Sequence, residues 1–122
     1  MCSSDLKLAE VSDQSLKGLE IMDRSGLKLG FGTDLLGHLH THQTREFVIR
    51  REVQSAAAIL RSATAVNAEI LMEPQLGKIQ AGCCADILIV DGDPLEDIGV
   101  LAQDGRSLSA IMKAGEFVKF SP

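Results

Sequence analysis

The stretch GKIQAGCCADILIVDGDP at residues 77–94 decides how this chain is organised. Residues 76–80 predict a short strand and the Ala-Gly pair at 81–82 predicts a turn, so the stretch begins as a β-hairpin. The uninterrupted apolar run at 87–90, bounded by acids, predicts a strand that is covered on both faces. The sequence Asp-Gly-Asp-Pro at 91–94 then predicts a turn.

The rest of the C-terminal part also predicts mainly β-structure. Residues 109–113 and 116–120 flank an Ala-Gly pair at 114–115, which predicts a closing hairpin. Between the two β-regions, residues 95–101 leave room for one helical turn. The second part of the chain is therefore expected to be mostly β.

The N-terminal part predicts a helix followed by a strand. Residues 1–11 show no clear period, whereas the apolar spacing from 13 to 25 suits a short amphipathic helix. Gly26 is suited to the position just past the end of that helix. Residues 27–32 then predict a strand, which completes half of an α/β unit. A single strand cannot form a sheet, so its partners must come from elsewhere.

A long helical region is predicted over residues 45–72, with a break near Thr64 or Asn67 and an end at the Glu-Pro pair at 73–74. Its charged side chains are interpreted as ion pairs on a solvated helix face. They are Arg45, Glu46, Arg50, Arg51, Glu52, Arg61 and Glu69. The chain contains no phosphate-binding loop, no dinucleotide-binding glycine pattern and no nucleophile elbow.

Composition limits the class of protein. The chain has 122 residues, of which 45% are hydrophobic and only 3% aromatic, so we expect one domain with an aliphatic core. The net charge of −5 argues against nucleic acid and anionic membranes as partners. No apolar run approaches the roughly 20 residues that span a bilayer, and no signal peptide is visible, so a cytoplasmic protein is expected. The three cysteines, two of them adjacent at 83–84, are predicted to be reduced.

Asp34 is the first candidate for chemistry. It follows Gly-Phe-Gly-Thr at 30–33 and so lies at the carboxyl end of the predicted strand, where α/β folds assemble their active sites. A carboxylate in that position can bind a divalent metal or accept a proton from a metal-bound water. The structural alternative is that Gly-Thr-Asp caps the segment that follows.

The polar loop predicted at residues 37–44 carries the three histidines of the chain, His38, His40 and His42. His40 and His42 form an H-x-H pair, and zinc accepts imidazole ligands, so a metal site is one interpretation. A loop that merely faces solvent is the structural alternative. Because the loop leaves directly from Asp34, contact with the substrate is preferred to metal binding.

The residues at 76–94 are similar to the C-terminal signature of the amidohydrolase superfamily, which is G-x-I-x-x-G-x-x-A-D followed by an apolar strand, an acid and a proline. The stretch GFGTD at 30–34 resembles the family's eighth barrel strand, whose terminal Asp binds metal and shuttles protons. Residues 35–37, 42–43, 46–47 and 61–64 resemble the prolidase-like and imidazolonepropionase-like branch. That branch hydrolyses amide bonds of dipeptide-like or cyclic substrates with a bound divalent metal.

The resemblance implies an α/β plus β fold, made of the last βα unit or units of a β/α barrel and part of the small β-sandwich that follows it. It divides the chain into a barrel portion at 12–72 and a sandwich portion at 76–120. It also implies that Asp34 is both the catalytic carboxylate and a metal ligand, with zinc as the expected metal of the intact enzyme.

The chain also departs from the family pattern. A complete β/α barrel needs about 250 residues, and the family's first-strand H-x-H, bridging Lys and later histidines have no counterparts here. His40 and His42 follow the last strand, so they do not replace the first-strand pair. One carboxylate cannot hold a catalytic zinc, which takes three or more protein ligands. We therefore expect a fragment that is inactive alone and binds no metal by itself.

Three readings stay open. The first is the C-terminal piece of an amidohydrolase that cleaves C–N bonds of amide, Xaa-Pro dipeptide-like or cyclic amide substrates. The second is a non-catalytic domain that assembles with itself or binds a partner, because an isolated strand exposes two unpaired edges. The third is one half of a split enzyme, in which another chain supplies the missing barrel half. A homo-oligomer is expected in the second case.

Overall fold

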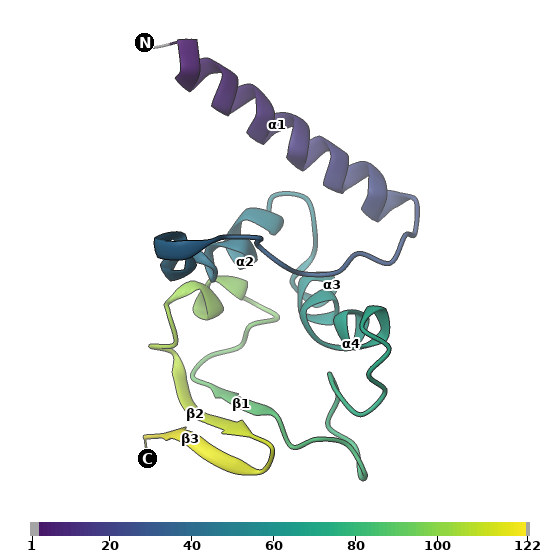
Figure 1. Cartoon of the computed structure of the whole chain (residues 1–122), viewed down its shortest axis with the longest axis vertical. Coiled ribbons are helices and arrows are strands. Elements are labelled where there is room, and N and C mark those ends of the chain that lie inside the picture. The colour runs from purple at the N-terminus through teal and green to yellow at the C-terminus, as the bar shows by residue number, and fades with distance from the viewer. Residues whose placement is uncertain (1–2, 122) are drawn as a thin grey trace.

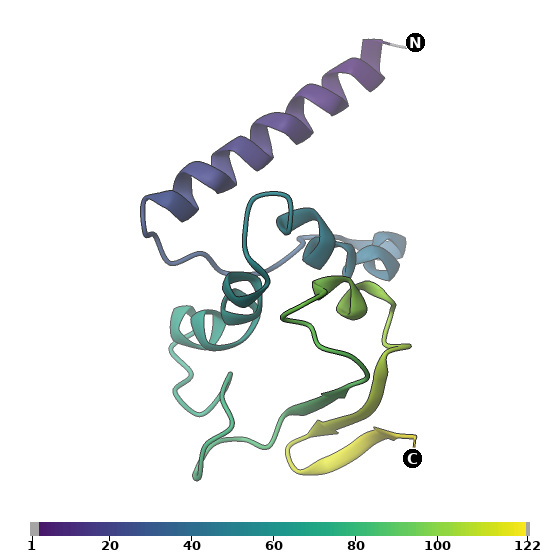
Figure 2. The same ribbon diagram turned by 180° about the vertical axis from the view of Figure 1, so that it is seen from behind.

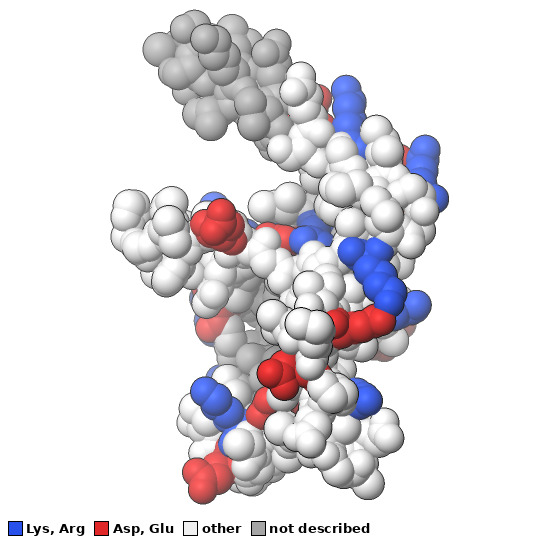
Figure 3. All heavy atoms as spheres, turned by 45° about the vertical axis from the view of Figure 1, so that its right-hand side comes forward, with Lys and Arg blue, Asp and Glu red and all other residues white. Residues whose placement is uncertain are grey.

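The computed structural model describes the backbone of residues 3–121 and the side chains of residues 13–121. Three parts follow one another along the long axis of the molecule (Figure 1): a long helix, a group of short helices, and a small sheet at the opposite end. The view from behind shows the same order (Figure 2). Basic and acidic side chains are interspersed on the face drawn in Figure 3, with no continuous patch of either sign.

Helix α1 spans Ser3–Arg24 and points away from the rest of the chain in Figures 1 and 2. It is longer than the predicted helix at 13–25, because it continues through residues in which the sequence shows no clear period. Gly26 adopts a φ of +73° just past its end, as predicted. Among the described residues, no helix is both long and apolar enough to cross a membrane.

The strand predicted at 27–32 does not form in this chain. Residues 27–36 form neither helix nor strand. A strand exists only when a neighbour completes its backbone hydrogen bonds, and within the described residues 3–121 the strands β1 to β3 pair only with one another. The predicted α/β unit is therefore wrong at this point as a description of the isolated chain.

The predicted long helix is divided into shorter pieces. Its main interruption lies at 51–55 rather than near Thr64, because Ser55 adopts an extended conformation and its side chain accepts a hydrogen bond from Ala58 N as an N-cap. Residues 56–70 stay helical and contain a π-helical turn where the break was predicted. The elements are the 3₁₀ helix η1 (Gly37–His42), α2 (Arg45–Arg50), α3 (Ala56–Arg61), the π-helical η2 (Ser62–Val66) and α4 (Asn67–Ile70).

The C-terminal part forms a three-stranded antiparallel sheet in the order β1-β2-β3. The strands are β1 (Ile87–Val90), β2 (Leu108–Lys113) and β3 (Glu116–Phe120), and the 3₁₀ helix η3 (Ile98–Ala102) precedes β2. The strand at 87–90, the helical turn and the closing hairpin are thus confirmed. Ala114 and Gly115 have φ of 51° and 85°, the positive values that a two-residue hairpin turn requires.

Two β predictions are wrong. Residues 76–80 are bends and irregular backbone instead of a strand, so the expected hairpin at 76–86 is absent. Strand β1 is not covered on both faces, because Leu88 is 53% and Ile89 is 51% exposed. Both errors have one cause. Pairing and coverage need further strands, and the three-stranded sheet offers β1 a single neighbour.

The core of the described side chains is small. Only four of the described hydrophobic residues are buried, namely Ile59, Ala68, Ile98 and Ala110. Many large apolar side chains stay exposed, among them Ile21 on α1 and Phe117 on β3. Such extensive apolar exposure is unusual for a self-contained domain and is typical of surfaces that meet another part of a protein.

Candidate active-site segment

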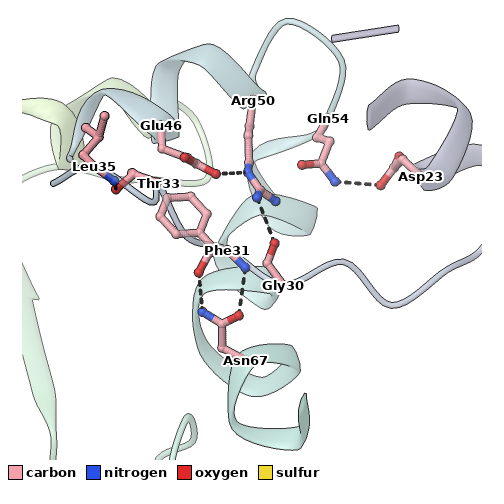
Figure 4. Close-up of polar contacts among 9 residues, drawn as sticks. All are labelled: Asp23, Gly30, Phe31, Thr33, Leu35, Glu46, Arg50, Gln54 and Asn67. Atoms are coloured by element: carbon pink, nitrogen blue, oxygen red, sulfur yellow. Dashed lines mark hydrogen bonds and ion pairs between the residues drawn. The ribbon is translucent and has the colours of Figure 1, made fainter. Parts of the chain in front are cut away.

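The segment that leads to Asp34 is bound by side chains, and not by neighbouring strands. The backbone N–H of Phe31 donates to Oδ1 of Asn67, and Nδ2 of Asn67 donates to the carbonyl of Phe31, both at 2.8 Å. Nη2 of Arg50 donates to the carbonyl of Gly30, also at 2.8 Å. Figure 4 shows these contacts converging on residues 30 and 31. We call Arg50 and Asn67 the backbone clamp.

Arg50 is itself firmly held. Only 9% of the residue is exposed, and its Nε lies 2.7 Å from Oε1 of Glu46 in an i,i+4 ion pair. Its guanidinium carbon lies 4.9 Å from the centroid of the Phe31 ring, and that ring lies 4.5 Å from the ring of Phe47. The predicted intrahelical ion pairing is therefore present, but this pair is buried instead of solvated.

Asp34 lies three residues beyond Phe31 and is exposed. Its φ of 53° is in the left-handed region, which Asp and Asn tolerate better than most residues. Beside it, the N–H of Leu35 donates to Oγ1 of Thr33 at 3.4 Å, a turn bond within this stretch. The N-cap of η1 is Leu36, which makes no side-chain cap bond.

The three histidines lie on η1 rather than in an irregular loop, and all are exposed. His42 lines a shallow pocket of about 250 Å³ together with Thr33 and Leu35, the residues on either side of Asp34. His40 lines a different hollow near Thr44. His42 thus shares a pocket with the two sequence neighbours of Asp34, although Asp34 is not among the residues that line it.

The donor groups of this chain do not make a metal centre. Among the described residues, no group of three or more His, Cys, Asp and Glu side chains is close enough together to hold a metal ion. The free thiols of Cys83 and Cys84 do not change this. Asp34 could contribute one ligand, but the described residues supply no others beside it.

Two residues of the signature stretch at 76–94 make contacts that stabilise the fold. Gly77 has a φ of +73°, and a Cβ at this position would lie 2.5 Å from the carbonyl oxygen of Thr64 and 2.9 Å from Cβ of Ala68. At the other end of the stretch, Oδ1 of Asp86 accepts a hydrogen bond of 2.8 Å from the N–H of Ala114 and holds the β2–β3 turn. Gly77 therefore packs against the π-helical turn, and Asp86 stabilises the closing hairpin.

The sequence model of the amidohydrolase family matches residues 3–118. This chain belongs to the amidohydrolase family. It is 45% identical to a prolidase solved in complex with N-methylphosphonate-L-proline, with a TM-score of 0.87 over 95% of this chain and 29% of that one. It is 31% identical to a Xaa-Pro dipeptidase with methionine bound in its active site, with a TM-score of 0.77 over 85% of this chain and 25% of that one.

Ochratoxinase of Aspergillus niger is a more distant relative, 28% identical over 116 residues that make up 93% of this chain and 24% of the relative. The chain thus spans about a quarter of the length of the proteins it matches. Enzymes of this family are generally metal-dependent, and the residues described above do not form a metal site on their own.

Sequence reasoning missed the two residues of the backbone clamp. Arg50 looked like one of several charged residues on a helix surface, and Asn67 looked like a helix break. The available signal was Asn67 itself, because asparagine is a poor helix former and its presence in a helix interior indicates a side-chain bond elsewhere. Nothing in the sequence separates Arg50 from its neighbour Arg51, which pairs with Asp97 at the surface.

Proposed function

We propose that this chain forms the C-terminal part of the catalytic domain of an enzyme that hydrolyses amide C–N bonds. The family match across residues 3–118 is the observation that supports this most strongly. Residues 12–72 would then complete a barrel, and residues 76–120 would add to a small β-sandwich beside it. The solved prolidase and Xaa-Pro dipeptidase favour Xaa-Pro dipeptides as substrates over cyclic amides.

Asp34 is the catalytic carboxylate in this proposal. It accepts a proton from the water that attacks the carbonyl carbon and returns that proton to the departing nitrogen as the C–N bond breaks. His42 lines a pocket with Thr33 and Leu35, the sequence neighbours of Asp34, and would meet the substrate there. His38 and His40 would act only at the margin of the site. The other groups of the centre, including those that complete a zinc site, would come from outside this chain. The isolated chain is expected to be inactive.

A chimera tests the proposal. Residues 3–118 replace the corresponding quarter of the 45% identical prolidase, and hydrolysis of a panel of Xaa-Pro dipeptides is measured. We expect turnover that Asp34→Asn lowers by about 10²–10⁴-fold, the usual contribution of a general acid–base group. Asn tolerates the positive φ of this position, so the variant removes the charge with little change to the backbone.

Asp104→Asn is the matched control, because Asp104 is also exposed and has a φ of 52°. Its Oδ1 accepts a hydrogen bond from Oγ1 of Thr44, and asparagine keeps that acceptor, so the variant removes only the charge. It should leave the rate unchanged. A folded chimera without turnover, or one in which Asp34→Asn is as active as Asp104→Asn, would contradict the proposal. Dipeptide hydrolysis by the isolated chain, with or without added zinc, would contradict the expectation that it is inactive alone.

Self-assembly is a second candidate, favoured by the exposed face of the sheet. Ile89 lies opposite Ala110, which in turn lies opposite Phe120, so these side chains share one face. Phe117 shares it too, with its ring 5.1 Å from that of Phe120, and the two rings are 57% and 62% exposed. Both outer strands also have an open edge. A second copy of this chain would cover the face in the arrangement of a β-sandwich.

A further inference from the structure

We propose that Asn67 and Arg50 are positioning residues for Asp34. They fix the backbone of Gly30 and Phe31, and through it the place of the carboxylate three residues further along the chain. The inference rests on the proposed role of Asp34. It adds that α2 and α4 of this chain, and not only neighbouring barrel strands, order the segment that carries it.

The bonds from Asn67 are equivalent to those of a paired strand. A primary amide carries the same donor and acceptor as a peptide group, and Asn67 satisfies both polar groups of Phe31 at once. In an antiparallel sheet, a hydrogen-bonded pair of residues exchanges the same two bonds. Two bonds to one residue restrict its rotation as well as its position.

Gly30 shows how closely α4 approaches the segment. A Cβ built at this position would lie 2.9 Å from Oδ1 of Asn67 and 3.1 Å from Cδ1 of Ile70. A larger residue would therefore require either the amide that binds Phe31 or the segment to shift. The φ of Gly30 is not positive, so close approach, and not backbone conformation, favours glycine here.

Arg50 provides a third bond from a different element. Figure 4 shows the segment running between α2, which carries Arg50, and the helix that carries Asn67. The ion pair with Glu46, on the same helix, orders the guanidinium independently of the segment, and the Phe31 ring packs against it. A donor that is already ordered loses little entropy when it forms this bond.

The π-helical turn sets the direction in which Asn67 points. The turn at Ser62–Val66 ends one residue before Asn67. A π turn contains about one residue more than an α turn, so the side chains after it are rotated by roughly 100° relative to a regular helix. Such turns occur frequently at functional sites. Here the turn directs the amide toward Phe31.

Amide hydrogen exchange and ¹⁵N relaxation of the full chain test the inference. Asn67→Leu removes both hydrogen bonds with little change in volume. We expect the exchange rate of the Phe31 amide to rise at least about 10-fold. The order parameters of the amides at 32–34 should fall, while exchange in β1 to β3 stays unchanged. A residue that only stabilised the fold would alter exchange across the chain and leave local order intact.

Glu69→Gln is the matched control. Glu69 lies on the same helix and links it to the same segment through an exposed ion pair with Lys28. This variant should leave the Phe31 amide unchanged. Should Asn67→Leu fail to fold, Asn67→Asp keeps an acceptor for the Phe31 N–H and removes the donor to the Phe31 carbonyl, and we expect a smaller rise in exchange at Phe31.

The inference would be overturned if the Phe31 amide exchanged at the same rate in the wild type and in the Asn67 variants. It would also be overturned if Glu69→Gln raised that exchange rate as much as Asn67→Leu does. These readouts need no catalytic activity. An active Asp34→Asn chimera would therefore refute the proposed function and leave the measurement on Asn67 intact, whereas unchanged exchange would refute only the positioning role.

Discussion

Gly77→Ala should destabilise the chain more than Gly82→Ala, a change at another glycine of the signature stretch. The φ of +73° alone costs a non-glycine residue roughly 1–2 kcal/mol. The new Cβ would also lie 2.5 Å from the carbonyl oxygen of Thr64, a backbone atom that cannot rotate away, and overpacking costs typically about 1–3 kcal/mol. The sum is about 2–5 kcal/mol, a large part of the stability of a small domain.

Gly82→Ala separates the two contributions. Gly82 has a similar φ of +86°, but no atom lies within 4 Å of its built Cβ, so only the conformational cost of about 1–2 kcal/mol applies. Urea unfolding followed by far-UV circular dichroism measures both variants, since the chain contains no Trp or Tyr for fluorescence. We expect the midpoint of Gly77→Ala to lie about 1–2 M below that of Gly82→Ala. Equal urea midpoints for the two variants would refute the close contact between Gly77 and the π-helical turn.

Two further predictions concern the sheet. Ala114→Asn should raise the free energy of unfolding by about 0.5–1 kcal/mol, because Asn tolerates the φ of 51° in this hairpin turn better than Ala; an unchanged or lower urea midpoint would contradict this. Sedimentation equilibrium at micromolar concentration should show a homo-oligomer that Phe117→Lys dissociates. Leu88→Lys, on the opposite face and similarly exposed at 53%, should not dissociate it. A monomeric wild type would exclude self-assembly through this face.

The sequence predicted the elements that local signals specify. The positive φ of Gly26 ends α1, the Ala-Gly pair at 114–115 makes the last hairpin, and the run at 87–90 forms β1. Each of these depends on a few adjacent residues. The strands predicted at 27–32 and 76–80 have suitable side chains but no partner, and the sequence pattern of a strand cannot report whether a partner is present.

The two residues of the backbone clamp could not be predicted from neighbouring residues in the sequence, for a related reason. Arg50 and Arg51 are adjacent and chemically identical, yet one is buried against the carbonyl of Gly30 and the other is exposed beside Asp97. Only the tertiary arrangement of α2 and the segment that leads to Asp34 distinguishes them. Asp34, in contrast, was found from its position after GFGT, and its proposed role stays a prediction.

The π-helical turn makes the number of residues in this helix as important as their identity. Gly77 fits against Thr64 and Ala68, whereas Gly30 fits against Asn67 on the same short stretch. Loss of one residue between Ile59 and Asn67 would relax the turn into a regular helix and rotate both contact surfaces together. A single-residue deletion in this stretch would therefore break the fit to Gly77 and the bonds to Phe31 at the same time.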